Sequence, residues 1–244
     1  MNIYSSLQKS IVSGKKHFAV LIDPDKYNLA ALKRVVKIAT KSGADYFFFG
    51  GSLLTKDNQD QFILTIRELS KIPVILFPGN SLQLNAHADG ILLLSLISGR
   101  NPDMLIGRHV ISAPFLKSSG LEILPTGYML IESGRMTTVT YMSNTTPIPS
   151  NKDEIAVCTA MAGEMLGLKL IYMDAGSGAE HPVPGSMIRK VKAAVKAPLI
   201  IGGGITTPEL AKKAWDSGAD VVVIGNAIET NPELIKEISK ACQS

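Results

Sequence analysis

The chain has 244 residues, 45% of them hydrophobic and 19% charged, a globular balance with enough apolar material for a large core. The formal net charge is +4 and the basic residues are scattered, so we expect no nucleic-acid partner. No apolar run reaches the ~20 residues of a membrane span, and the N-terminus lacks the order of a signal peptide, so we expect a cytoplasmic protein without a membrane span.

Short apolar runs alternate with helical patterns along the chain. The runs are continuously apolar, which is typical of parallel strands with both faces covered, and each is followed by a helix candidate. The strand candidates are the segments 17–22, 44–50, 73–77, 90–94, 121–131, 168–174, 198–202 and 220–225. The helix candidates are the segments 28–43, 55–70, 79–88, 101–120, 152–167, 184–196, 207–218 and 231–243.

Strict alternation of this kind predicts a parallel sheet. Eight such units in a chain of this length predict a closed (β/α)8 barrel, a TIM barrel, as a single domain over residues 1–244. An open doubly wound sheet is the alternative, but it favours a glycine fingerprint after the first strand, where this chain has "DPDK". The segment 132–150 has no clear periodicity, and we expect it as a functional loop on the catalytic face after the fifth strand.

Glycines mark the ends of the last two strands, where barrels often bind phosphate. Strand 198–202 runs into "GGGI", with Gly203 and Gly204, and strand 220–225 ends at Gly225 and Asn226. Bare backbone N–H groups there, with a helix start at Asn226 if one forms, favour a dianionic phosphate. Tight turns without a ligand are the alternative.

The sixth strand ends in "YMDAGSGA", which begins at Tyr172. Tyr172 and Asp174 alternate to the same face of the strand, and Gly176, Ser177 and Gly178 form a flexible loop with a hydroxyl group. Asp174 is a candidate acceptor or base for a substrate hydroxyl. The alternatives are a loop acceptor for Asp174 and a core position for Tyr172.

The first and second strands end in oxygen-bearing residues. Asp23 follows the first strand in "DPDK", and Ser52 follows the second in "FGGS". A carboxylate and a hydroxyl are hard ligands that suit Mg²⁺, which accepts few protein ligands together with water and phosphate oxygens. Turn stabilisation is the alternative for both, and a solvated turn is favoured for Asp25 and Lys26.

The histidines and cysteines suggest no metal site. No histidine has metal-ligand spacing, and His181, near the expected catalytic face, is favoured as a structural residue. Cys158 and Cys242 have no CxxC partner and indicate free thiols in a reducing compartment.

Taken together, "DPDK", "GGS", "YMDAGSGA", "GGGI" and "VIGNAI" resemble geranylgeranylglyceryl phosphate synthases, in the branch with archaeal and Bacteroidetes-type bacterial members. The resemblance covers nearly the whole chain in order. It implies Mg²⁺-dependent transfer of a polyprenyl group, usually geranylgeranyl, from its diphosphate to the 3-hydroxyl of sn-glycerol 1-phosphate, in ether-lipid synthesis. It also implies a homo-oligomer, and a lipid product leaves room for peripheral membrane contact.

Residue by residue, the resemblance implies Mg²⁺ at Asp23 and Ser52, and Asp174 and Tyr172 as catalytic residues. The residues implied for glycerol 1-phosphate are Tyr172, Met173, Asp174, Ala175, Gly176, Ser177, Gly178, Gly203, Gly204, Gly225 and Asn226. A prenyl chain also needs an apolar groove. Candidates near the ends of the third to fifth strands are Phe77, Leu94, Phe115 and Tyr128, each with plain barrel core as the alternative.

Two positions depart from the pattern of the family. Asp174 stands where Glu is usual, which draws the carboxylate back by roughly 1.2–1.5 Å, a displacement of the kind that can cost about 10²-fold in rate. Leu21 stands where some members have a lysine, and its presence fits the proposed branch; Lys26 is a candidate replacement for that charge. Two alternatives therefore stay open: a barrel isomerase or lyase for a phosphosugar-like substrate, and a phosphate-binding barrel without turnover.

Overall fold

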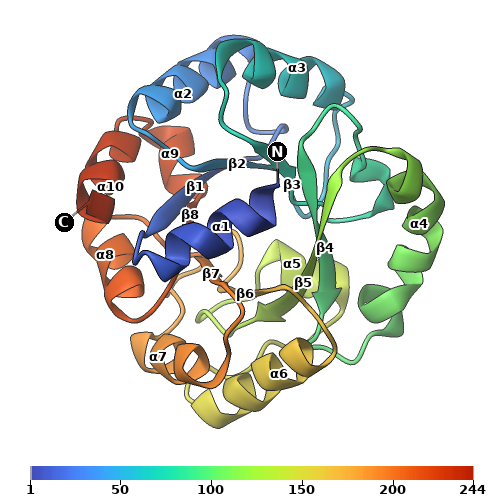
Figure 1. The fold of residues 1–244 in the computed structure, drawn as a ribbon, viewed down its shortest axis with the longest axis vertical. Helices are drawn as coiled ribbons and strands as arrows, with labels where there is room; N and C mark the ends of the chain where they lie inside the picture. Colours follow the sequence, from blue (N-terminus) through green and yellow to red (C-terminus); the bar gives the residue numbers. More distant parts are fainter. Residues whose placement is uncertain (1, 244) are drawn as a thin grey trace.

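The computed structural model describes residues 2–243 and contains a closed barrel of eight parallel strands, arranged in chain order (Figure 1). The strands are β1 His17–Ile22, β2 Tyr46–Phe49, β3 Val74–Leu76, β4 Gly90–Leu96, β5 Glu122–Leu130, β6 Leu170–Asp174, β7 Leu199–Gly202 and β8 Val221–Ile224. The barrel closes where β1 pairs with β8, with Ala19 opposite Val223. The predicted (β/α)8 barrel is confirmed, and the open-sheet alternative is excluded because its edge strands would not pair.

Alternation along the strands divides the apolar side chains between two layers. In β1, Ala19 lies inside the barrel, whereas Val20 and Ile22 pack outward beneath the helices. The helices are α1 Ile3–Val12, α2 Leu29–Lys41, α3 Gln59–Leu69, α4 Arg108–Ser118, α5 Thr138–Ser143, α6 Asp153–Met165, α7 Gly185–Ala194, α8 Pro208–Asp216, α9 Asn226–Thr230 and α10 Leu234–Gln243. Within residues 2–243, no helix combines the length and apolarity needed to cross a bilayer.

The connection between β3 and β4 departs from the prediction. The expected helix over 79–88 is reduced to a 3-10 turn at Ser81–Gln83. The Asn80 side chain accepts a hydrogen bond from the Leu82 N–H, and the Asn85 side chain accepts one from the His87 N–H. Such local bonds compete with a helical backbone. The ring of helices around the barrel is therefore interrupted between α3 and α4.

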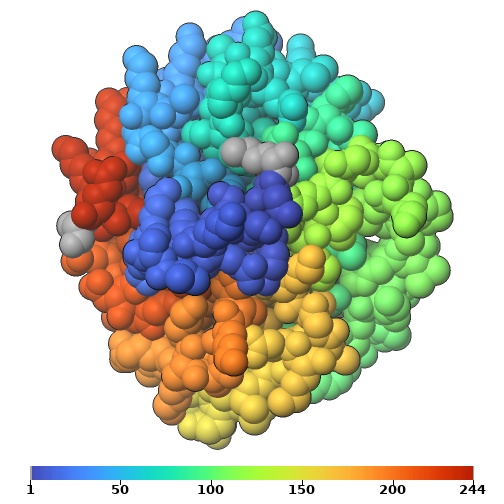
Figure 2. Space-filling model, in the orientation of Figure 1, coloured from blue at the N-terminus to red at the C-terminus, as the bar shows by residue number. Residues whose placement is uncertain are grey.

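Helix α1 precedes the first strand and was not predicted. It lies across the amino-terminal end of the barrel, where Figure 1 shows it in front of the strands and Figure 2 shows its side chains covering the centre of that face. Ile3 and Leu7 of α1 pack into the interior apolar cluster. The Glu122 carboxylate accepts hydrogen bonds from the Ile3 and Tyr4 N–H groups, as suits a negative charge at a helix N-terminus. This end of the barrel is thereby closed.

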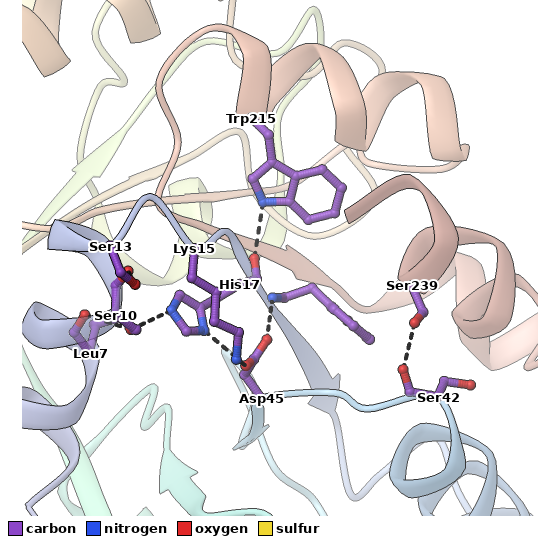
Figure 3. A network of polar contacts seen from close by, with 10 residues as sticks. Leu7, Ser10, Ser13, Lys15, His17, Ser42, Asp45, Trp215 and Ser239 are labelled. Carbon is purple, nitrogen blue, oxygen red and sulfur yellow. Dashed lines mark hydrogen bonds and ion pairs between the residues drawn. The ribbon is translucent and has the colours of Figure 1, made fainter. Parts of the chain in front are cut away.

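A polar network ties α1 to the start of β1 and to the turn before β2 (Figure 3). His17 bridges Ser10, 2.7 Å from its Nε2, and Asp45, 2.9 Å from its Nδ1. Lys15 adds a 2.6 Å ion pair to Asp45. Burial raises the pKa of the Asp45 carboxyl, but the hydrogen bonds from His17 and Lys15 outweigh it and hold that pKa below its usual range. The network supports the fold at the end opposite the carboxyl ends of the strands.

Candidate active site

A cavity of about 360 Å³ lies at the carboxyl ends of the strands. Residues that follow β1, β2, β3, β6, β7 and β8 line it. Val139 and Met142 of α5 also line it, so the predicted loop 132–150 reaches this face, although part of it is helical. The cavity continues to Leu93 of β4 and Leu116 of α4.

Close backbone packing explains the glycine triplet at the end of β7. Gly203 and Gly204 have φ of +78° and +69°, a region that favours glycine. A Cβ on Gly203 would lie 2.6 Å from the Gly176 nitrogen and 2.7 Å from Asp174 Oδ1. The loops after β6 and β7 therefore approach each other as closely as bare backbone allows.

Asn226 joins the loop after β8 to this corner. Asn226 is the first residue of α9, so a helix does start at the position where the sequence allowed for one. Its Oδ1 accepts hydrogen bonds from Ser177 Oγ at 3.0 Å and from the Gly178 N–H at 3.3 Å. Gly225 also lines the cavity. The result is a small polar corner built from glycine backbone and one amide side chain, suited to an anion.

Asp174 is the last residue of β6, at the carboxyl end of the strand, and is only 6% exposed. Its Oδ2 accepts a 2.5 Å hydrogen bond from the Tyr128 hydroxyl, and its Oδ1 accepts a 2.7 Å bond from the Gly176 N–H. Burial raises the pKa of the Asp174 carboxyl, and the two hydrogen bonds oppose that rise. A carboxylate with a raised pKa on a cavity wall is suited to accept a proton.

The alternation along β6 separates the residues predicted for the substrate loop. Tyr172 and Asp174 both face the interior and line the cavity, whereas Met173 and Ala175 belong to the outer apolar layer and do not line it. Met173 pairs with Ile201 of β7 through its backbone, and the Ala175 N–H donates to the Gly202 carbonyl. The Tyr172 ring stacks on Phe77, with centroids 5.2 Å apart, and burial raises its pKa well above the usual range.

Asp23 and Ser52 lie on the opposite wall and line the same cavity. The Asp23 carboxylate packs against the turn that carries Ser52, because a Cβ on Gly51 would lie 3.1 Å from Asp23 Oδ2. Within residues 2–243, no group of three or more His, Cys, Asp or Glu side chains is arranged to hold a metal ion. The Asp23 and Ser52 oxygens fit Mg²⁺, which takes hard oxygen ligands and fills its remaining positions with water and phosphate.

Asp25 serves mainly as a loop acceptor. Its carboxylate accepts hydrogen bonds from the Thr55 N–H and hydroxyl at 2.7 and 2.9 Å. Lys26 is exposed at the edge of the cavity. His181 is exposed and does not line the cavity, and its backbone N–H donates to the Ser133 carbonyl.

The apolar part of the cavity contains three of the four predicted groove residues, Phe77, Leu94 and Tyr128. Phe115 lies outside it, because α4 turns this side chain outward, where it is 40% exposed. The next residue, Leu116, is buried and lines the cavity instead. The apolar wall that sequence reasoning missed includes Leu84, Ile91, Leu93, Met104 and Leu116.

Two charged residues on the cavity wall were also missed, Arg108 and Glu229. Arg108 is the first residue of α4, and Glu229 belongs to α9. Both belong to helices rather than to strand ends. A search confined to strand-end motifs does not reach them.

A (β/α)8 barrel with a polar glycine corner, a buried carboxylate and an apolar channel in one cavity is typical of an enzyme, and this cavity suits a substrate with an anionic group and an apolar one. A family model described as the PcrB family matches residues 10–242. A geranylgeranylglyceryl phosphate synthase of Chitinophaga pinensis is 53% identical over 98% of this chain and 95% of its own length. One of Spirosoma linguale is 54% identical, over 93% of this chain and 92% of its own.

A solved structure agrees with these relatives. The (S)-3-O-geranylgeranylglyceryl phosphate synthase of Thermoplasma acidophilum, in complex with sn-glycerol-1-phosphate, superposes with a TM-score of 0.93. It is 30% identical and covers 99% of this chain and 98% of its own. The chain belongs to the PcrB family and, within it, to the geranylgeranylglyceryl phosphate synthases, which confirms the resemblance read from the motifs. It is a prenyltransferase, which decides against the isomerase, lyase and non-catalytic alternatives.

Proposed function

We propose that this protein transfers a polyprenyl group, geranylgeranyl by family, from its diphosphate to the 3-hydroxyl of sn-glycerol 1-phosphate, with Mg²⁺ as cofactor. The observation that carries the proposal is that one cavity joins the glycine corner of β6–β8 to the apolar channel beside β4 and α4. The glycerol phosphate belongs in the corner, because backbone N–H groups there suit a phosphate. The prenyl chain belongs in the channel, because its walls are leucine, isoleucine and methionine.

Asp174 is placed to handle the proton of the reaction. The glycerol oxygen bonds to C1 of the prenyl group, the bond from C1 to the diphosphate breaks, and the hydroxyl proton passes to the Asp174 carboxylate. The hydrogen bonds from Tyr128 and Gly176 hold that carboxylate in place before the reaction. Its buried position keeps its pKa raised, which strengthens it as a proton acceptor.

The shorter side chain of Asp174 is compatible with this role. Both of its oxygens already have partners, and Asp174 Oδ1 lies beside Gly203, at the edge of the phosphate corner. The glycerol can therefore lie closer to β6 than a glutamate would permit. Tyr172 closes the floor of the cavity beside it, stacked on Phe77.

Asp23 and Ser52 would hold Mg²⁺ with oxygen atoms on the wall opposite β6. When bound, Mg²⁺ offsets the charge that develops on the diphosphate as it leaves. The Asp23 carboxylate is oriented toward this role by the Asp25 N–H, which donates to its Oδ1 at 3.0 Å. We infer that diphosphate is bound on this wall and glycerol phosphate on the other.

An incubation of the purified protein with labelled sn-glycerol 1-phosphate, Mg²⁺ and prenyl diphosphates of several lengths tests the proposal. After phosphatase treatment, label should move into organic solvent with Mg²⁺ and remain in water with EDTA. The enantiomer, sn-glycerol 3-phosphate, serves as the control and should react poorly. Absence of transfer with every donor, while sn-glycerol 1-phosphate still binds, would contradict the proposal.

A further inference from the structure

The charges on the cavity wall are unbalanced toward carboxylates. Four carboxylates line the cavity, and they are Asp23, Asp25, Asp174 and Glu229. The lysine and arginine side chains on the wall are Lys26, which is exposed, and Arg108, which is half-buried. A diphosphate donor therefore needs a cation as well as the proposed Mg²⁺, and Arg108 is the one held inside the cavity.

The Arg108 guanidinium has little to hold it within the protein. Its Nη1 donates a 2.6 Å hydrogen bond to the Gly79 carbonyl. Among residues 2–243, no carboxylate lies within ion-pair distance of it. A guanidinium carries several further N–H donors in a rigid fork, and a partly buried cation gains from an anionic partner. The Arg108 guanidinium is therefore suited to donate further hydrogen bonds to an anionic ligand.

Gly79 relates Arg108 to the wall that carries Ser52. A Cβ on Gly79 would lie 2.5 Å from the Gly51 carbonyl oxygen and 2.7 Å from that of Ser52. Because Gly79 packs on this turn, the hydrogen bond to Gly79 places the guanidinium next to the Asp23–Ser52 wall. The segment around Arg108 also supplies Met104 and Leu116 to the apolar channel. Arg108 thus lies where the channel meets that wall.

We propose that Arg108 binds the diphosphate group of the prenyl donor and stabilises its charge as it leaves. The inference rests on the proposed function and assigns a residue to its leaving group. The planar fork of arginine matches two phosphate oxygens at once, and a charge-assisted pair strengthens as negative charge accumulates on the leaving group. Helix α4 lies on the opposite side of the barrel from β7 and β8, so Arg108 is not the ligand of the glycerol phosphate (Figure 1).

Inorganic pyrophosphate with Mg²⁺ is the probe that isolates this contact, measured by calorimetry and as a product inhibitor. Arg108→Gln should weaken pyrophosphate binding by about 10- to 100-fold, since a hydrogen bond to a charged group contributes about 1.5–3 kcal/mol. Arg108→Lys, which keeps the charge and loses the fork, should fall in between. Lys117→Gln removes the same charge from an exposed position of α4 and should change binding by less than about twofold.

Binding of sn-glycerol 1-phosphate and the melting temperature separate a ligand contact from a structural one. The inference expects both to match the wild type in Arg108→Gln, while kcat/KM for the prenyl diphosphate falls. Equal pyrophosphate affinity in Arg108→Gln and Lys117→Gln would overturn it, and so would a parallel loss of glycerol phosphate binding. If the glutamine variant fails to fold, Arg108→Lys carries the same comparison. Failure of the proposed function looks different, because the wild type itself would then form no prenylated product.

Discussion

Asp174 and Tyr128 form the most constrained pair in the active site. The 2.5 Å hydrogen bond joins the hydroxyl of the buried Tyr128 to a carboxylate whose pKa is raised by burial. The Tyr128 hydroxyl donates to the ionised carboxylate and thereby lowers that pKa. Tyr128 is therefore a positioning residue for Asp174, in addition to lining the channel.

Removal of this hydroxyl should shift the pH dependence of the reaction. Asp174 must be ionised to accept the proton, so activity falls as pH falls through its pKa. Tyr128→Phe removes a contact that lowers this pKa, so the acid limb of the kcat/KM profile should move to higher pH. The loss should reach about tenfold on the acid side, as expected for one hydrogen bond to a charged group, and should shrink at high pH.

The matched control for that variant is Tyr141→Phe, the same change at a side chain that is 76% exposed. Its pH profile should coincide with that of the wild type. An unshifted acid limb in Tyr128→Phe would show that Asp174 does not depend on Tyr128 for its ionisation.

At the scale of elements, α1 closes one end of the barrel, whereas the β3–β4 connection lies near the other end, where the cavity is. Helix α1 inserts Ile3 and Leu7 against the interior cluster and closes one end. The 3-10 turn at Ser81–Gln83 replaces a helix near the other end, where Leu84 lines the cavity. The stability of the barrel and the space for its substrates therefore depend on different connections.

The contribution of α1 can be measured with one truncation. Leu7 is 4% exposed, and Leu7→Ala should lower the free energy of unfolding by about 2–5 kcal/mol. Val12→Ala, on the same helix at 89% exposure, should change it by less than about 0.5 kcal/mol. Denaturant unfolding checks both values, and equal midpoints would mean that α1 does not support the barrel.

At the scale of the whole molecule, the glycine corner brings together the loops that follow three successive strands, β6, β7 and β8. The Gly203 backbone meets that of Gly176, and Asn226 bonds to Ser177 and Gly178. A ligand held by these loops binds only when β6, β7 and β8 are in place. Ligand binding should therefore stabilise the entire barrel.

The size of that stabilisation follows from mass action. At a concentration about 100 times the dissociation constant, sn-glycerol 1-phosphate should add about 2.7 kcal/mol to the free energy of unfolding. For a chain of this length, that corresponds to a rise in melting temperature of roughly 5–10 °C. Differential scanning fluorimetry checks it, with sn-glycerol 3-phosphate as the control. An equal rise in melting temperature with both enantiomers would indicate a site that binds phosphate without distinguishing the configuration of the glycerol.

Assembly, membrane contact and Mg²⁺ stay predictions. Met161, on α6, packs partly against the core, whereas Met165 is 80% exposed and remains a candidate for a contact between subunits. Val110 and Ile111 of α4 are also exposed apolar side chains.

The sequence by itself determined the strands, their order and the motifs at their ends. These features are local: a strand covered on both faces must be apolar throughout, and Gly203 and Gly204 mark backbone that no side chain could occupy. Because the carboxyl ends of parallel strands meet at one end of a barrel, motifs far apart in the chain could be assigned to one site. By this rule Asp174, Asp23 and Ser52 belong to one face of the barrel, and all three line the cavity.

The tertiary structure alone decided which side chains of the helices and connections reach that site. A difference of one residue on α4 turns Phe115 to solvent and Leu116 to the cavity, and this depends on how the helix docks on the barrel. Arg108 and Glu229 joined the site in the same way, through the docking of α4 and α9. Packing between distant segments sets these orientations, and no local pattern in the sequence records it.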